Sequence, residues 1–297
     1  MDKILNDRLY ECHGHLMMDG ADFFRAKRRH ESGVDTEKVK EELGKLKDAG
    51  VVYFRDGGDA LGVSVYAGSI AAKYGITCVT PIFAIHKKGY YGGIVGHAYS
   101  DLTEFRALVK KVREEGGDFI KIMISGIITF NGYGELSCPS LSEEEIRSLV
   151  KTAHDAGFPV MLHVNGDPAI RAALKAGADS IEHGAFMSEE TARLLAESPA
   201  VWVPTAAAIA AFTVREGIDP DIAKKTLEHH LACIRLAAKE GAFIAAGSDS
   251  GAAGVLHGSG TKEEYRLLSQ AGVSQEILAK GNERIAAVFH KRSAGKG

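Results

Sequence analysis

Short apolar runs alternate with longer amphipathic stretches along the whole chain of 297 residues. The short runs are rich in β-branched residues and predict β-strands. They are Leu9–Leu16, Val51–Arg55, Thr77–Ile85, Phe119–Ile124, Pro159–Val164, Ser180–His183, Val201–Pro204 and Phe243–Ser248. The stretches between them carry apolar residues at helical spacing and predict helices. These are Thr36–Ala49, Val63–Tyr74, Leu102–Glu115, Ser142–Ala156, Pro168–Ala176, Ser188–Ala196, Ile222–Glu240 and Lys262–Ser269, and Gln275–His290 closes the chain.

The residues at the ends of the predicted helices fit these bounds. Ser142-Glu143-Glu144-Glu145 is a capping box, which marks a helix start. A glycine directly follows many of the helical runs, where a left-handed residue is needed before the chain turns into the next strand. These glycines are Gly50, Gly75, Gly116, Gly157, Gly177 and Gly241.

Eight strand–helix units with short turns between them predict an α/β fold with a parallel sheet closed as a (β/α)8 TIM barrel. No linker or low-complexity segment divides the chain, so we expect one domain over residues 1–297, closed by the C-terminal helix. A doubly wound sheet is the alternative. Such a sheet would normally carry a glycine-rich phosphate-binding turn after its first strand, but this chain has His13-Gly14-His15 there.

Composition narrows the class of partner. Lys and Arg number 36 and Asp and Glu number 39, for a net charge of −3 with the signs mixed, so neither nucleic acid nor an anionic membrane is an expected partner. No apolar run approaches the roughly 18 residues of a membrane helix, and residues 1–7 lack a signal-peptide hydrophobic region. The four cysteines form no CxxC pair, which suits reduced thiols. We therefore expect a cytoplasmic protein acting on a small molecule; a homo-oligomer is compatible with the sequence.

Titratable residues stand at the ends of several predicted strands, and in a barrel the carboxyl ends of all strands meet at one mouth. They are His13, His15, Lys121, His163, His183 and Asp249. Each alone has an ordinary explanation, such as a core histidine bonded to a carbonyl or an aspartate capping a turn. His13 and His15, however, share one face of their strand because they are two residues apart. Jointly the six residues form a donor set for two divalent ions.

Lys121 lies in the apolar strand Phe119–Ile124, where an inward ammonium is desolvated. Desolvation lowers the pKa of a lysine and leaves a neutral amine. Such an amine can form a Schiff base, or react with carbon dioxide to give a carbamate. A lysine that extends its ammonium to the strand end is the structural alternative.

With these residues identified, the chain resembles the amidohydrolase superfamily over nearly its whole length, in the branch of prolidase-like dipeptidases and imidazolonepropionase. The resemblance rests on an ordered set of stretches. They are Glu11-Cys12-His13-Gly14-His15, Gly50–Gly58, Asp118–Ile122, Ala153–Gly157, Ala176–Gly184, Val203-Pro204-Thr205 and Gly247-Ser248-Asp249.

The resemblance implies a binuclear metal centre with a metal-bridging hydroxide as nucleophile. His13 and His15 would hold the first ion, His163 and His183 the second, and a carbamate on Lys121 would bridge them. Asp249 would bind the first ion and carry protons. Zinc is the expected metal, although manganese, iron or cobalt also suits nitrogen and oxygen donors. Many relatives carry a small flanking β-sandwich, which we do not expect here.

Substrate contacts are expected in the loops that follow the strands. His97 resembles the loop histidine that contacts the substrate carbonyl in this family and is predicted to be catalytic, with His86 as a rival. The loops at His86–Ser100, Ser125–Ser140, Thr205–Pro220 and Ser250–Gly260 are long. Tyr133 is the predicted substrate contact among their polar residues, which also include Tyr90, Tyr91, Asn131 and His257.

The leading functional hypothesis is hydrolysis of an amide-type bond in a dipeptide, an N-acyl amino acid or a cyclic amide. A lactonase or phosphotriesterase would use the same metal core. A Schiff-base aldolase is a second class, because Asp118–Lys121 also resembles the reactive strand of deoxyribose-phosphate aldolase. That alternative leaves four histidines without a role. Ligand binding without turnover is a third.

Overall fold

The computed structural model describes residues 8–291, and every strand in that part of the chain runs parallel to its neighbours. The strands are β1 (Leu9–Gly14), β2 (Val51–Asp56), β3 (Thr77–Val79), β4 (Ala84–Lys87), β5 (Gly96–Tyr99), β6 (Ile120–Met123), β7 (Val160–Val164), β8 (Ser180–His183), β9 (Val201–Val203) and β10 (Phe243–Ile244).

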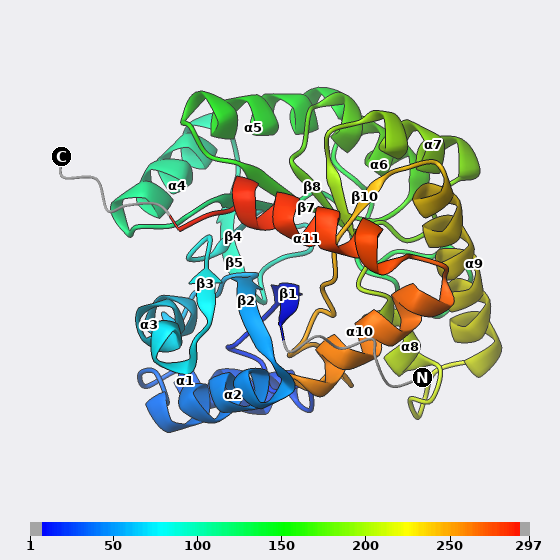
Figure 1. Ribbon diagram of the computed structural model, residues 1–297. Helices are drawn as coiled ribbons and strands as arrows, with labels where there is room; N and C mark the ends of the chain where they lie inside the picture. Colours follow the sequence, from blue (N-terminus) through cyan, green and yellow to red (C-terminus); the bar gives the residue numbers. More distant parts are fainter. Residues whose placement is uncertain (1–7, 292–297) are drawn as a thin grey trace.

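Helices surround the strands (Figure 1). They are α1 (Phe23–His30), α2 (Thr36–Ala49), α3 (Val63–Ile70), α4 (Leu102–Glu114), α5 (Glu143–Asp155), α6 (Asp167–Lys175), α7 (Glu189–Glu197), α8 (Ala206–Phe212), α9 (Pro220–Lys239), α10 (Ser259–Gln270) and α11 (Gln275–Val288), with a 3-10 turn η1 (Ala71–Tyr74) after α3. None of these helices is both long and apolar enough to span a membrane.

The strands form two arcs, ordered β1-β2-β3 and β10-β9-β8-β7-β6-β4-β5. Isolated backbone hydrogen bonds join the arcs into a barrel. On one side, the Cys12 N–H donates to the Ala246 carbonyl and the Asp249 N–H to the His13 carbonyl, both at 2.8 Å. On the other, the Asp118 N–H donates to the Thr80 carbonyl at 2.8 Å. The predicted (β/α)8 barrel is therefore confirmed. Its two arcs are joined by isolated backbone hydrogen bonds rather than by continuous strand pairing.

The interior of the barrel is layered. An apolar layer fills the end of the barrel at which the strands begin. Its side chains come from successive strands and include Cys12, Tyr53 and Met161. Helix α11 closes this end, where the Phe289 ring lies 5.3 Å from the Phe119 ring and the Tyr53 hydroxyl donates to the Phe289 carbonyl. Figure 1 shows α11 lying across the strands. A binding or catalytic site is therefore expected at the opposite end, where the carboxyl ends of the strands lie.

The third predicted strand, Thr77–Ile85, is wrong as a single element. It divides into β3, in the first arc, and β4, in the second. Pro81 has no N–H for a ladder, and Ile82 has φ of 68°, so the backbone changes direction between the two parts. The following loop, predicted over His86–Ser100, instead contains β5, which pairs with β4.

Other boundaries also differ from the prediction. Helix α1 was not predicted, because Phe23–His30 is mostly charged. The eighth strand is shorter than Phe243–Ser248, since only Phe243 and Ile244 pair with β9. The prediction of left-handed glycines after the helices is confirmed at all six positions, with φ between 73° and 92° at Gly50, Gly75, Gly116, Gly157, Gly177 and Gly241.

Candidate metal centre

A cavity of about 250 Å³ opens at the carboxyl ends of the strands. All six residues predicted as metal ligands line it: His13, His15, Lys121, His163, His183 and Asp249. They come from β1, β6, β7, β8 and the segment after β10. Barrel geometry therefore brings together side chains that are separated by up to most of the chain.

Lys121 lies at the centre of this cluster. Its Nζ is 3.2 Å from His13 Nε2 and 3.3 Å from His15 Nε2. Asp249 Oδ1 lies 3.6 Å from His13 Nε2 and 3.7 Å from His15 Nε2. Ligand atoms of these two histidines and Asp249 all lie within 4.8 Å of one another, which is close enough for one ion to contact all three.

The other two histidines complete the cluster on its far side. The His163 and His183 ring centres are 4.5 Å apart, and the His183 ring centre is 4.9 Å from that of His13. His163 Nε2 lies 3.4 Å from the Gly126 carbonyl, so a proton on Nε2 leaves Nδ1 with its lone pair. A second donor group therefore adjoins the first.

The protonation of the cluster suits metal binding. Burial, followed by the charge of Lys121, lowers the pKa of His163 to about 3, and the same two causes lower those of His13 and His15. Neutral imidazoles keep the lone pair that a metal needs. Burial also lowers the pKa of Lys121 to about 8, against the opposing charge of Asp249. A fraction of this amine is thus neutral near pH 7 and able to react with carbon dioxide.

A buried polar layer beneath the cluster orients His13. His13 Nδ1 lies 2.7 Å from Glu182 Oε2, and Arg55 donates to Glu182 Oε1 at 2.7 Å. The guanidinium also donates to the Cys12 carbonyl and to Ser180 Oγ. Because the carboxylate accepts from Nδ1–H, His13 presents the lone pair of Nε2 to the cavity.

Several residues around the cavity have a backbone conformation that is unfavourable for residues other than glycine. His183, Asp249, Thr205 and Phe130 all line the cavity and have φ values between 51° and 66°. Positive φ at such residues costs free energy and is found preferentially at functional sites. The strain fixes where the His183 and Asp249 side chains point.

These observations together fit a site that can hold divalent metal, with His13, His15 and Asp249 close enough for one ion. The donors are neutral imidazoles and a carboxylate, and the amine between them has the lowered pKa that carbamate formation requires. The residues fit the group that the sequence implies.

One wall of the cavity is helix α8, which is fixed at its N-terminus. Thr205 precedes the helix, and its Oγ1 lies 2.8 Å from His183 Nδ1. The buried Glu264 carboxylate accepts from the Ala207 N–H at 2.7 Å and so binds one of the free N–H groups of the first turn. Further along, α8 presents Ile209 and Phe212 to the cavity.

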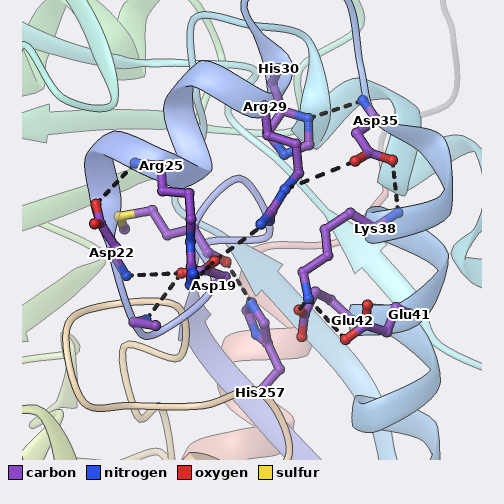
Figure 2. A network of polar contacts seen from close by, with 12 residues as sticks. Asp19, Asp22, Arg25, Arg29, His30, Asp35, Lys38, Glu41, Glu42 and His257 are labelled. Carbon is purple, nitrogen blue, oxygen red and sulfur yellow. Dashed lines mark hydrogen bonds and ion pairs between the residues drawn. The ribbon is translucent and has the colours of Figure 1, made fainter.

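Another part of the rim is the segment between β1 and α1, and Figure 2 shows how it is held. Asp19 accepts the N–H groups of Ala21 and Asp22 and forms ion pairs with Arg25 and Arg29. Buried His257 lies 3.1 Å from the Met18 carbonyl through Nε2. The network positions Met18 and Phe23, which line the cavity.

Three residues predicted to contact substrate lie outside the cavity lining. His97 pairs with Ile85, whose side chain is in the core between sheet and helices, and its ring contacts Phe83 at 4.5 Å. Burial, followed by the charge of Lys111 on α4, lowers its pKa. His97 therefore faces the outer helical layer.

His86 and Tyr133 lie nearer to the mouth. His86 is on the inner face beside Met123, and a Cβ on Gly92 would come within 2.5 Å of its Cβ, so the Gly92 backbone covers it. Tyr133 contacts the Phe186 ring, and Lys225 Nζ lies 4.3 Å from the centre of its ring. Neither is among the residues that line the cavity.

Tyr91, rather than His86 or His97, is the polar residue of this region that reaches the cavity. It follows β4, lines the cavity and lies with its ring centre 5.1 Å from that of His163. Burial, and then the charge of Asp249, raises the pKa of its hydroxyl, so the group remains a donor. The sequence does not distinguish Tyr91 from the other polar loop residues, because only the fold of residues 88–95 shows which of them lines the cavity.

Comparisons with known proteins agree with this geometry. Residues 56–283 match the model of the amidohydrolase family. Ochratoxinase from Aspergillus niger is 29% identical over 193 residues, which cover 63% of this chain and 38% of that protein. An uncharacterised protein from Mycobacterium tuberculosis is 30% identical over 105 residues, covering 35% of this chain and 28% of that protein. The chain thus spans less than half the length of these curated relatives.

Solved structures share the fold. A Xaa-Pro dipeptidase with methionine bound in its active site has a TM-score of 0.73 at 22% identity, covering 97% of this chain and 77% of that one. The A. niger ochratoxinase structure has a TM-score of 0.73 at 22% identity, covering 94% and 69%. Molinate hydrolase has a TM-score of 0.69 at 18% identity, covering 95% and 73%.

Proposed function

The chain belongs to the amidohydrolase family, and from that premise we propose that it is a metal-dependent hydrolase of an amide-type carbon–nitrogen bond in a small molecule. Candidate substrates are a dipeptide, an N-acyl amino acid or a cyclic amide. The observation that carries the proposal is the convergence of four histidines, Lys121 and Asp249 on one cavity. Burying six titratable side chains together costs free energy, and a barrel that only binds a ligand would gain nothing from that cost.

We assign the metals to the predicted residues. His13, His15 and Asp249 would hold one ion, and His163 and His183 the other. Lys121, as a carbamate formed with carbon dioxide, would contribute one oxygen to each. Two ions bound there, of which zinc is the proposed identity, would supply Lewis acidity and lower the pKa of water.

Asp249 is proposed as the group that moves protons. It is the one carboxylate among the described lining residues, and its side chain is 17% exposed. In hydrolysis the oxygen of water bonds to the carbonyl carbon and the carbon–nitrogen bond breaks. Asp249 would accept the proton that water releases and deliver it to the leaving nitrogen.

Tyr91 is proposed to orient the substrate carbonyl. Among the described residues no hydrogen bond uses its hydroxyl, and Tyr91 lines the cavity with its ring beside that of His163. A donor aimed at the carbonyl oxygen stabilises the negative charge that develops there during attack.

Metal analysis and a hydrolysis screen test the proposal together. Purified protein should contain close to two divalent ions per chain. It should hydrolyse members of a panel of dipeptides, N-acyl amino acids, cyclic amides and lactones. Chelator should abolish the activity, and zinc with bicarbonate should restore it. Turnover of lactones but of no amide would assign the lactonase alternative instead.

Lys121→Ala tests the bridge. We expect loss of activity and of at least one ion, with partial recovery in formate or propionate, whose carboxylates can replace the carbamate. Lys151→Ala is the matched control, because Lys151 is exposed and pairs only with Asp155 on its own helix. A Lys121→Ala variant with both metals and full activity would refute the assignment. Labelling of Lys121 by borohydride in the presence of an aldehyde would favour the aldolase.

A further inference from the structure

The cavity wall away from the metal cluster is almost entirely apolar. Beyond the six proposed ligands, the polar residues among its lining are Tyr91, Asn165 and Thr205. Lys121 is the one lysine or arginine in that lining. A binding site for a substrate carboxylate would normally place a cation or several free donors in the wall.

Two of the three polar side chains already have hydrogen-bond partners in the protein. Asn165 donates through Nδ2 to the Gly126 carbonyl at 3.1 Å and accepts through Oδ1 from the Ala185 N–H at 3.0 Å. Thr205 Oγ1 pairs with His183. Tyr91 is thus the one of the three whose side chain has no hydrogen-bond partner among the described residues, and all three are neutral groups that do not neutralise a carboxylate.

Nearby cations are directed elsewhere. The Arg215 guanidinium lies 5.1 Å from the centre of the Phe212 ring, and Lys225 lies over Tyr133. Arg215, Lys225 and Tyr133 are all outside the cavity lining. They do not supply the missing counter-charge at the wall.

The entrance has the same character as the wall. Ile94 and Ile127 line the cavity and remain 38% and 40% exposed. Phe130 and Phe212 stack at 4.5 Å on one side, and Met123 lines the inner part. Exposed apolar side chains at the mouth of a cavity favour entry of an apolar ligand.

From this wall we infer that the substrate is uncharged away from its scissile bond and carries an apolar acyl or aryl group of modest size. The inference rests on the proposed hydrolase activity and narrows it, because it disfavours dipeptides and N-acyl amino acids with a free carboxylate. A carboxylate seated against this wall would be desolvated without a partner. The cavity of about 250 Å³ also excludes large substrates.

A matched pair of chromogenic anilides tests the inference with the metal-supplemented chain of 297 residues. The 4-nitroanilide of 5-methylhexanoic acid has an isopropyl end where glutaryl-4-nitroanilide has its carboxylate, and release of 4-nitroaniline is measured for both. We expect kcat/KM to be at least about tenfold higher for the apolar member, because a tenfold ratio corresponds to a small part of the cost of burying an unpaired charge. Equal or faster hydrolysis of the glutaryl compound would overturn the inference.

A binding measurement separates this inference from the proposed function. N-(5-methylhexyl)-4-nitroaniline and 5-(4-nitroanilino)pentanoic acid lack the scissile carbonyl, and calorimetry gives their dissociation constants whether or not the protein hydrolyses amides. Tighter binding of the first compound supports the apolar wall even if every amide is inert, a result that would count against the hydrolase alone. Tighter binding of the acid, or binding of neither, contradicts the apolar wall.

A pair of arginine variants tests whether the preference for the apolar anilide arises at the cavity wall. Phe212→Arg adds a cation to the wall, whereas Val214→Arg adds one at a position that is 88% exposed and outside the lining. We expect Phe212→Arg to shift the kcat/KM ratio at least tenfold toward the glutaryl anilide and Val214→Arg to leave it unchanged. Equal shifts in both would show that general electrostatic attraction sets the preference. The wild-type comparison stands if Phe212→Arg fails to fold.

Discussion

Tyr91 differs from the other polar residues of the cavity in that its hydroxyl has no hydrogen-bond partner among the described residues. Asn165 and Thr205 hold the backbone and His183 in place, so their polar atoms serve the structure. A hydroxyl without a partner, beside the proposed ligands, is available to a substrate. At the scale of the residue, this is the feature that gives the proposed reaction its polarising group.

Tyr91→Phe should therefore lower kcat/KM for a neutral anilide by about 100-fold, as removal of one donor to a developing oxyanion does in other hydrolases. Metal content and thermal stability should not change, because the hydroxyl makes no hydrogen bond to any residue that the structure describes. Tyr90→Phe is the control, since Tyr90 packs against the outer core and Lys87 rather than lining the cavity. A Tyr91→Phe enzyme with normal kcat/KM would remove Tyr91 from the mechanism.

At the scale of the element, the docking of α11 beneath the strands depends on a close backbone approach. A Cβ on Gly281 would lie 1.9 Å from the Ile244 carbonyl oxygen, so only glycine allows α11 to rest on β10. Gly44, in the middle of α2, has no atom within 4 Å of the corresponding position. A side chain therefore has no room at Gly281 but fits freely at Gly44.

Gly281→Ala should destabilise the protein by about 3 kcal/mol, because the helix must move away from the strand. Gly44→Ala should stabilise it by about 0.5–1 kcal/mol, because alanine has the higher helix propensity and space is available. Denaturant unfolding of both variants measures the two effects. Equal changes in the free energy of unfolding would contradict the proposed role of the α11 contact.

The hydrophobic pattern predicted most elements because the buried strands are short and largely apolar, as in β7 and β9, and alternate with amphipathic helices. It failed at Thr77–Ile85, where the apolar sequence continues through Pro81 although the backbone turns. It also failed at α1, because Arg25 and Arg29 hold this helix through ion pairs with Asp19 rather than through a broad apolar face.

The six cavity residues could be predicted from the sequence because titratable residues at strand ends meet at the mouth of a barrel. No pattern in the sequence showed that His97 faces outward. That orientation follows from its pairing with Ile85 in an unpredicted strand.

At the scale of the whole molecule, the barrel consists of two arcs joined by few backbone bonds, and the proposed ligands come from both. His13 and His15 belong to the first arc, whereas Lys121, His163 and His183 belong to the second. Metal ions shared between them would cross-link the arcs. Binding to the native state alone also stabilises it by mass action.

Removal of metal by chelator should therefore lower the free energy of unfolding by about 2.7 kcal/mol when compared with metal at 100 times its dissociation constant. Hydrogen exchange should quicken most at the amides of Cys12, His15 and Asp249, which close the barrel beside the cluster. The Ile146 amide in α5 is an internal reference, because its helix lies away from that seam. Uniform acceleration across the barrel would argue against a cross-link.

Helix α8 has a consequence for how new enzymes could be made from this one. Its first turn is anchored through Glu264 and Thr205, next to His183, while Ala208, Ile209 and Phe212 project into the cavity from later positions. Libraries randomised at those three positions can therefore vary what the protein accepts without disturbing the residues proposed to carry out the reaction. The helix is therefore a starting point for directed evolution of the proposed activity toward new substrates.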